Sequence, residues 1–232
     1  MRRFRDYSLS IKMNVIFSTI AIVVISLILL IIGYNTTDMA SQNARQTARE
    51  MAFRYGNRVE ADIEAALVES RAIASLVEGS LRSPYNELSR NQVNDMLKHF
   101  IESHKEFLGV YVAFEPDAFD GRDAAFRNAR GHDSTGRFIP YWTRGDRGKG
   151  NLEALVDYEK KGAGDYYQVP KETGKETILD PYKYEIQGEE VLLTSVVVPL
   201  FNSKNDFIGI AGIDLSLKDI SSMISDINVY DT

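Results

Sequence analysis

Aromatic rings and carboxylates gather between Phe138 and Tyr184. Aromatic faces attract an organic cation by roughly 0.5–2 kcal/mol for each face, and a desolvated carboxylate adds a charge-assisted hydrogen bond. The same rings would stack on a flat heterocycle. The alternative is a set of tyrosines that simply pack with their hydroxyls at the surface; an open cavity beside Trp142 would favour binding. The residues concerned are Tyr141, Trp142, Tyr158, Tyr166, Tyr167, Tyr182 and Tyr184, with Asp157, Asp165 and Asp180.

Signatures of common enzyme sites are missing from the sequence. The chain has no Cys, which excludes thiolate metal sites and Cys nucleophiles. Gly174-Lys175 is followed by Glu176 rather than by Ser or Thr, so it is not a phosphate-binding loop. His99 and His104 are five residues apart, which is off-face for shared metal ligation on a helix. We therefore expect no catalytic residues, metal or cofactor, with a membrane-anchored enzyme or a purely structural module as the alternatives.

A stretch of 25 uncharged residues, Met13 to Thr37, follows a basic N-terminus. About 20 apolar residues in a helix cross a hydrocarbon core of about 30 Å. Positive flanks stay cytoplasmic, so we expect a single membrane span, with the later residues outside. A cleaved signal peptide is the alternative, but its apolar region is shorter. The basic residues are Arg2, Arg3, Arg5 and Lys12, against the acidic Asp6.

The part of the chain after the apolar stretch is acidic. The formal net charge is -6 and becomes -9 without the first 12 residues, of which four are basic and one is acidic. Nucleic-acid binding is not expected, because neutralising phosphates needs clustered Lys and Arg.

The pattern of apolar residues predicts an α+β fold. Apolar and small residues recur at helical spacing through residues 38–81, and Ser89 and Gln92 form a capping-box spacing that opens a second helix. Strands are predicted at 107–114, 137–144, 176–179, 182–186, 191–200 and 207–215. Hairpin links between them predict an antiparallel sheet packed against the long helix. Ser216 and Asp219 predict a final helix.

The order of these features resembles a Cache-type sensor, the membrane-distal module of a double-Cache domain with a PAS-like sheet. Such domains are the extracytoplasmic input of bacterial methyl-accepting chemotaxis receptors, and also of sensor histidine kinases and diguanylate cyclases. The resemblance covers residues 13–232. Its motifs are the membrane span with its long helix, the runs 136–144 and 162–167, Asp180-Pro-Tyr182, and Gly209-Ile-Ala-Gly-Ile-Asp214.

The resemblance implies a set of ligand-binding positions. Amino-acid-binding members hold the ligand carboxylate with a basic residue before a Pro-Trp-Tyr triplet; here Ile139 precedes Pro140-Tyr141-Trp142. They hold the amino group with a Tyr in a Pro-Tyr strand and with an Asp at the end of a Gly-x-x-Gly-x-Asp strand. The corresponding residues here are Tyr182 and Asp214. An amine or purine-like ligand is therefore implied. The resemblance also implies Tyr184 as a site residue, together with Asp165 and Tyr167 of the segment 162–167, which would form a lid over the pocket. In an amino-acid sensor, Arg144 would replace the missing basic residue that holds the ligand carboxylate.

The resemblance also implies how the chain is divided. We expect a cytoplasmic N-terminus (1–12), a transmembrane helix (13–34), a long extracytoplasmic helix (35–82), a ligand-binding module (83–217), and the start of a connection to a membrane-proximal module (218–232). The chain would then be the N-terminal fragment of a chemoreceptor, or a truncated gene product. The partners implied are a small molecule, the membrane, a second copy joined through the long helix, and cytoplasmic proteins reached through a C-terminal region outside this sequence.

Overall fold

The computed structural model describes residues 8–83, 88–144 and 149–217, except for the side chains of residues 37 and 38. The chain divides into two units, one formed mainly by residues 1–54 and one by residues 55–226. Each unit is described by itself below. The final helix predicted from residue 216 onward lies almost wholly outside the described residues.

Helix α1 (Leu9–Arg82) contains both the apolar stretch and the helix predicted for residues 38–81. In the first unit its apolar side chains, such as Leu29 and Ile32, are exposed. Among the described residues it is the one helix long and apolar enough to cross a membrane. An exposed apolar helix of this length is what a lipid-spanning segment requires, because its backbone groups are all bonded internally.

The second unit is built on an antiparallel sheet, as predicted. The strand order is β3-β2-β1-β7-β6-β4, and β5 also pairs with β6. The sheet is continuous from β2 to β6 because β1 pairs with both β2 and β7. The strands are β1 (Gly109–Phe114), β2 (Pro140–Arg144), β3 (Gly150–Ala154), β4 (Thr177–Ile178), β5 (Tyr182–Ile186), β6 (Glu189–Phe201) and β7 (Phe207–Ser216).

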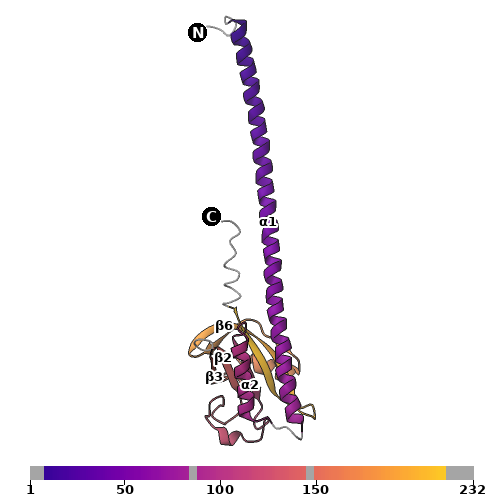
Figure 1. Cartoon of the computed structure of the whole chain (residues 1–232), viewed down its shortest axis with the longest axis vertical. Coiled ribbons are helices and arrows are strands. Elements are labelled where there is room, and N and C mark those ends of the chain that lie inside the picture. The colour runs from indigo at the N-terminus through magenta and orange to yellow at the C-terminus, as the bar shows by residue number, and fades with distance from the viewer. Residues whose placement is uncertain (1–7, 84–87, 145–148, 218–232) are drawn as a thin grey trace. The chain divides into compact units, whose positions relative to one another are not determined.

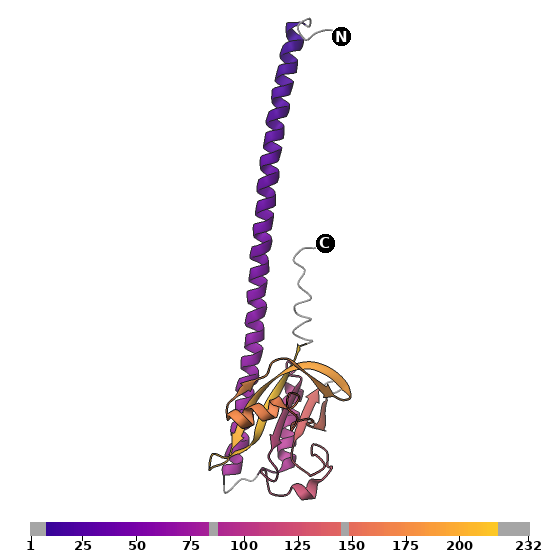
Figure 2. The ribbon, with the colours of Figure 1, turned by 180° about the vertical axis from the view of Figure 1, so that it is seen from behind.

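Each face of the sheet is covered by helices (Figures 1 and 2). Helix α2 (Arg90–Ser103) and the residues of α1 after Tyr55 cover one face, and α3 (Asp165–Thr173) covers the other. Covered faces explain the nearly continuous apolar runs of β6 and β7, because both sides of these strands are buried. The core on the helix-α2 side includes Val77, Leu97, Val110, Trp142, Val196 and Ile213.

Strand β3, helix α3 and the short 3-10 helix η2 (Asp123–Phe126) were not predicted. Strand β3, Gly-Asn-Leu-Glu-Ala, contains no β-branched residue and buries only Leu152, since it lies at the sheet edge. Helix α3 is short and contains Pro170, which is unfavourable inside a helix. Its end is set by Gly174, which adopts a left-handed φ of 64° and donates its N–H to the carbonyl of Pro170.

Polar contacts fasten helix α1 to β6 and to the end of α3. Ser70 donates to the carbonyl of Val196 at 3.3 Å. Glu78 accepts the N–H of Phe201 at 2.7 Å. Arg71 makes a bidentate pair with Glu176, which lies between α3 and β4. The long helix therefore contacts β6, and β6 also presents side chains on the opposite face of the sheet.

Candidate ligand-binding site

Five tyrosines lie together on the face of the sheet that α3 covers. Tyr111 meets Tyr141 and Tyr166 edge to face, with ring centroids 5.7 and 5.9 Å apart. Tyr184 meets Tyr141 and Tyr166 in the same way, each at 5.7 Å. Tyr182 stacks on Tyr166 at 6.4 Å. We call Tyr111, Tyr141, Tyr166, Tyr182 and Tyr184 the tyrosine cluster; its rings come from β1, β2, α3 and β5.

Asp214 of β7 lies beneath the tyrosine cluster and is only 2% exposed. Its Oδ2 accepts the hydroxyl of Tyr141 at 2.7 Å, and its Oδ1 accepts the hydroxyl of Ser195 at 2.5 Å. The Ser195 hydroxyl also lies 2.7 Å from that of Tyr182. Burial raises the pKa of Asp214 to about 7, although these hydrogen bonds to Ser195 and Tyr141 act to lower it. The site thus holds a carboxylate whose charge costs free energy unless a partner stabilises it.

Two glycines allow tyrosine rings to lie across the sheet. A Cβ on Gly109 would lie 2.4 Å from the ring of Tyr141, so that ring crosses β1 on its way to Asp214. A Cβ on Gly212 would likewise lie 2.4 Å from the ring of Tyr111, which crosses β7. Side chains at these glycine positions would displace the rings, because both contacts are far inside van der Waals distance.

The segment between β3 and α3 is fastened to the tyrosine cluster through Val156. The hydroxyl of Tyr166 donates to the Val156 carbonyl at 2.6 Å. The Val156 N–H donates to the hydroxyl oxygen of Tyr184 at 2.9 Å. Helix α3 and this segment therefore cover the cluster and would have to move for a molecule to reach Asp214.

Two hollows of the surface flank the tyrosine cluster. The first, of about 490 Å³, is lined by Tyr141 and Tyr184 and by charged residues such as Glu153 and Lys183. The second, of about 410 Å³, is lined by Tyr166, Tyr182 and the loop before β5. Asp214 lines neither hollow. The tyrosine rings therefore separate the carboxylate from both.

Trp142 lies on the opposite face of the sheet from Tyr141. Neighbouring residues of a strand point to opposite faces, and Trp142 packs with Leu97 and Val110 in the core beneath α2. Its indole N–H donates to Asn94 of α2 at 2.9 Å. The expectation that Tyr141 and Trp142 share one pocket is therefore corrected.

Arg144 is engaged at the end of α2. Its guanidinium donates to the carbonyl of His104 at 3.2 Å and also to the carbonyls of Lys105 and Phe107. These contacts hold the turn between α2 and β1 against β2. The structure thus does not bring Arg144 together with Asp214. All three bonds are made by Nη2, and the buried Nε has no partner within the described part of the chain.

Asp165 and Tyr167 belong to α3 but lie outside the tyrosine cluster. Asp165 accepts the N–H of Gly162 at 2.8 Å at the start of the helix and lines the second hollow. Tyr167 bonds Glu115 and Arg137, and its ring packs on Phe207. The Arg137 guanidinium, which is buried, lies over the rings of Tyr158 and Tyr167, so this group fastens α3 to the sheet.

Sequence reasoning missed two members of the site, Tyr111 and Ser195. It named Tyr166 among the aromatic residues but chose Tyr167 as the lid residue. Alternation along β1 could have placed Tyr111 on the same face as Gly109, and alternation along β7 places Gly212 with Asp214. Ser195 pairs with Asp214 in the antiparallel register of β6 and β7. That register depends on the tertiary fold. The same is true of the orientation of α3 about its axis, which places Tyr166 rather than Tyr167 in the tyrosine cluster.

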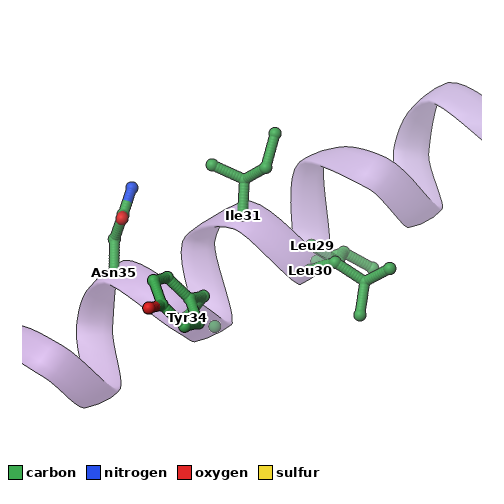
Figure 3. A pocket seen from close by; sticks show the side chains of 6 residues that line it. Leu29, Leu30, Ile31, Tyr34 and Asn35 are labelled. Atoms are coloured by element: carbon green, nitrogen blue, oxygen red, sulfur yellow. The ribbon is translucent and has the colours of Figure 1, made fainter.

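A larger hollow on helix α1 contributes nothing to this site. It has a volume of about 680 Å³ and is lined by Leu29, Leu30, Ile31, Gly33, Tyr34 and Asn35. Figure 3 shows that the labelled side chains all extend from one helix. It is a groove on the surface of an apolar helix and contains no charged group.

Comparisons with known proteins identify the fold and the family. The family described as "Methyl-accepting chemotaxis protein-like, first PDC sensor domain" matches residues 93–222. The methyl-accepting chemotaxis protein TlpQ of Pseudomonas aeruginosa is 30% identical over 145 residues, which make up 58% of this chain and 20% of TlpQ. This chain therefore spans about a fifth of that relative.

Solved structures show the same fold. The extracellular domain attributed to a histidine kinase, mmHK1S-Z3, is 38% identical with a TM-score of 0.69, covering 82% of this chain and 65% of that one. The ligand-binding domain of the Campylobacter jejuni chemoreceptor Tlp3, in complex with 4-methylisoleucine, is 15% identical with a TM-score of 0.54, covering 81% and 64%. At that identity the likeness shows the fold alone. The resemblance to Cache-type sensors is thus confirmed, and the chain belongs to the family of first PDC sensor domains of methyl-accepting-chemotaxis-protein-like receptors.

Proposed function

We propose that this sensor domain binds a small amine or a purine-like heterocycle between the tyrosine cluster and Asp214. The observation that carries the proposal is the buried Asp214 carboxylate, which has two hydroxyl partners and no basic residue among them. A structural carboxylate at this depth is normally paired with a cation. A cationic ligand would supply that partner, and the surrounding ring faces would add cation–π attraction.

Binding of a cation would change the protonation of Asp214. Burial raises the pKa of this group to about 7 in the free protein. A bound ammonium group stabilises the charged carboxylate and lowers its pKa again. Binding below pH 7 therefore releases a proton, and the affinity for an ammonium ligand should rise toward pH 8.

Access to Asp214 requires the tyrosine rings to separate. The first hollow reaches Tyr141 and Tyr184 from the side of β3 and β5, so it is the route that we propose. Opening there means releasing Val156 from Tyr184, which replaces one hydrogen bond by contacts with the ligand. The free energy of binding must exceed this cost, and the ligand then selects the opened conformation.

The sheet offers a direct connection from the site to helix α1. Ser195 of β6 bonds Asp214 on one face, and the next residue, Val196, accepts the Ser70 hydroxyl on the other face. We propose that ligand binding shifts β6 against α1 and so passes a signal toward the membrane. A tenfold difference in ligand affinity between the two states would supply about 1.4 kcal/mol of coupling.

The proposed setting is a bacterial inner membrane with the sensor in the periplasm. Residues 1–12 would be cytoplasmic, 13–34 would span the membrane, 35–82 would lead to the module at 83–217, and 218–232 would begin the connection to a membrane-proximal module. Two copies would associate through the long helix. The output would be a chemotaxis signalling region; a histidine kinase or a diguanylate cyclase is the alternative, reached beyond the present sequence.

An amino-acid ligand is the second candidate. Tlp3 structures of the same fold are described with isoleucine and valine bound, and the Asp214 carboxylate would suit an α-amino group. The carboxylate of such a ligand needs a basic partner. Arg144 is fastened through Nη2 to three backbone carbonyls at the end of α2 and is not part of the tyrosine cluster. The amine reading therefore has the stronger support.

A thermal-shift screen of the full chain in lipid nanodiscs tests the proposal. The compounds are amines, purines, amino acids and simple carboxylates. A ligand present at 100 times its dissociation constant adds about 2.7 kcal/mol to the stability of the protein that binds it. We expect stabilisation by an amine or a purine that is lost in the Asp214→Asn variant, with no chemical conversion of the compound. Stabilisation by carboxylates alone, or turnover of the bound compound, would contradict the proposal.

A further inference from the structure

The hydroxyl of Tyr111 is the exception within the tyrosine cluster. Tyr111 is 1% exposed, and its hydroxyl oxygen makes no hydrogen bond within the described part of the chain. A buried polar group without a partner is destabilising, so few are retained without a reason. The other hydroxyls of the cluster all have partners, namely Asp214 for Tyr141, Val156 for both Tyr166 and Tyr184, and Ser195 for Tyr182.

The position of the Tyr111 hydroxyl is fixed by Gly212. A Cβ on Gly212 would lie 2.5 Å from this hydroxyl oxygen, so the phenol group lies directly over β7. Burial, followed by the charge of Asp214, raises the pKa of Tyr111, which keeps the hydroxyl protonated as a donor. Ser195 lies close enough to act as a hydrogen-bonding neighbour that lowers the pKa of Tyr111. By distance and angle, however, no hydrogen bond is formed by the Tyr111 hydroxyl within the described part of the chain.

The protein acceptors near the Tyr111 hydroxyl bond other hydroxyl groups. Asp214 accepts from Tyr141 on one oxygen and from Ser195 on the other. Ser195 in turn shares its oxygen with Tyr182. Each Asp214 oxygen keeps a lone pair that a ligand donor can use, but the Tyr111 hydroxyl bonds neither oxygen. A buried donor without a bond at this place points to an acceptor that arrives with the ligand.

We propose that Tyr111 determines specificity by donating to an acceptor atom of the ligand that lies next to the group bound by Asp214. This inference rests on the proposed function and narrows the ligand class. The ligand carries a cationic or N–H donor for Asp214 and, one or two bonds away, a nitrogen or oxygen acceptor for Tyr111. An analogue that lacks the acceptor leaves the hydroxyl unpaired, and sites built to bond a polar atom reject such analogues.

Matched probe pairs test this inference by calorimetry on the full chain in lipid nanodiscs at pH 8. The first pair is 2-(aminomethyl)pyridine and benzylamine; the second is 2-aminopyridine and aniline. Each pair shares one donor and differs in a ring acceptor. We expect the wild-type protein to bind the pyridine member about tenfold more tightly. Tyr111→Phe should reduce that preference to less than twofold, whereas Tyr55→Phe, on α1, should keep it.

The stability of the Tyr111→Phe variant is the second measurement. Removing an unpaired hydroxyl should leave the unfolding midpoint equal to that of the wild type or higher. A lower midpoint would show that the hydroxyl is bonded in the free protein and would overturn the inference. So would a wild type that binds neither pair, or a preference that survives in Tyr111→Phe.

The two proposals fail in different ways. If Asp214→Asn abolishes binding of both members of a pair but Tyr111→Phe changes nothing, the role of Tyr111 is wrong and the proposed function stands. If Asp214→Asn leaves the affinity of every bound compound in the wider screen unchanged, the proposed function is wrong and the inference falls with it.

Discussion

The hydroxyl of Tyr141 donates to Oδ2 of Asp214 at 2.7 Å, and the ring that carries it lies across Gly109. The same arrangement recurs one strand over, where the ring of Tyr111 lies across Gly212. Glycine is the residue that lets another group approach the backbone this closely. The two glycines thus direct two hydroxyls over β7, toward the surroundings of Asp214.

Gly109→Ala should displace the ring of Tyr141. The new Cβ would meet that ring at 2.4 Å, and overpacking of a filled site typically costs about 1–3 kcal/mol. We expect a loss of unfolding free energy in this range, measured by urea denaturation of the full chain in detergent micelles. Binding of an amine at Asp214 should weaken as well.

Gly79→Ala is the matched control for this substitution. A Cβ at Gly79 of α1 meets nothing within 4 Å, and alanine in a helix is favoured over glycine by about 1 kcal/mol. This variant should be as stable as the wild type or more so. An equal loss of stability in both variants would show that the close approach of the Tyr141 ring to Gly109 has no special role.

The protonation of Asp214 should make stability depend on pH. Its pKa is about 7 in the folded protein and near 3.9 in an unfolded chain. The folded state binds the proton more tightly, so the contribution to stability is complete below about pH 4 and is lost as the pH rises to 7. The loss is roughly 4 kcal/mol.

The difference between wild type and Asp214→Asn isolates this effect. Carboxylates with lowered pKa values act in the opposite direction and are present in both proteins; they are Glu115, Asp120, Asp133 and Glu176. We expect Asp214→Asn to become more stable than the wild type as the pH increases from 4 to 8 in urea titrations. A difference that is constant over this range would mean that Asp214 is paired with a cation in the free protein.

Arg144→Ala should destabilise the turn that joins α2 to β1. The guanidinium holds three backbone carbonyls there, and hydrogen bonds to charged groups contribute about 1.5–3 kcal/mol. We expect a loss near the lower end, because the side chain is only partly buried. The ratio of affinities for an amine and for its amino-acid analogue should stay constant in calorimetry; a selective loss of the amino acid would restore Arg144 as a carboxylate clamp.

Trp142 should report on folding but hardly on the ligand. Its ring packs beneath α2, on the face opposite the tyrosine cluster. We therefore expect a tyrosine-site ligand to leave the wavelength of its fluorescence maximum almost unchanged. Trp142→Phe should lower stability while keeping ligand affinity within about twofold. A large spectral shift on binding would mean that the ligand binds on the α2 side of the sheet, which would contradict our account.

Periodicity and turn chemistry were sufficient to predict most of the fold. The stripe through residues 38–81 and the capping box at Ser89 predicted α1 and α2, and both are confirmed. Strand β3 has little local preference for its conformation and is held by pairing with β2. Local sequence therefore could not predict it.

The site was harder to predict than the fold, because each residue depends on the direction of its side chain. Tyr141 and Trp142 are adjacent, and only the register of β2 against β1 decides that Tyr141 faces Asp214. Likewise, Tyr166 and Tyr167 are adjacent on α3 and only Tyr166 enters the cluster. The ligand roles of Asp214, Tyr182 and Tyr184 remain predictions.

Calorimetry of wild type and Asp214→Asn at pH 8, with the tightest amine or purine from the screen, tests the central claim most directly. Truncating one partner of a buried charge pair costs about 2–5 kcal/mol, so the variant should bind at least about 30-fold more weakly. Glu172→Gln removes one charge from the exposed side of α3 and should bind as the wild type does. Equal affinities in wild type and Asp214→Asn would contradict the account.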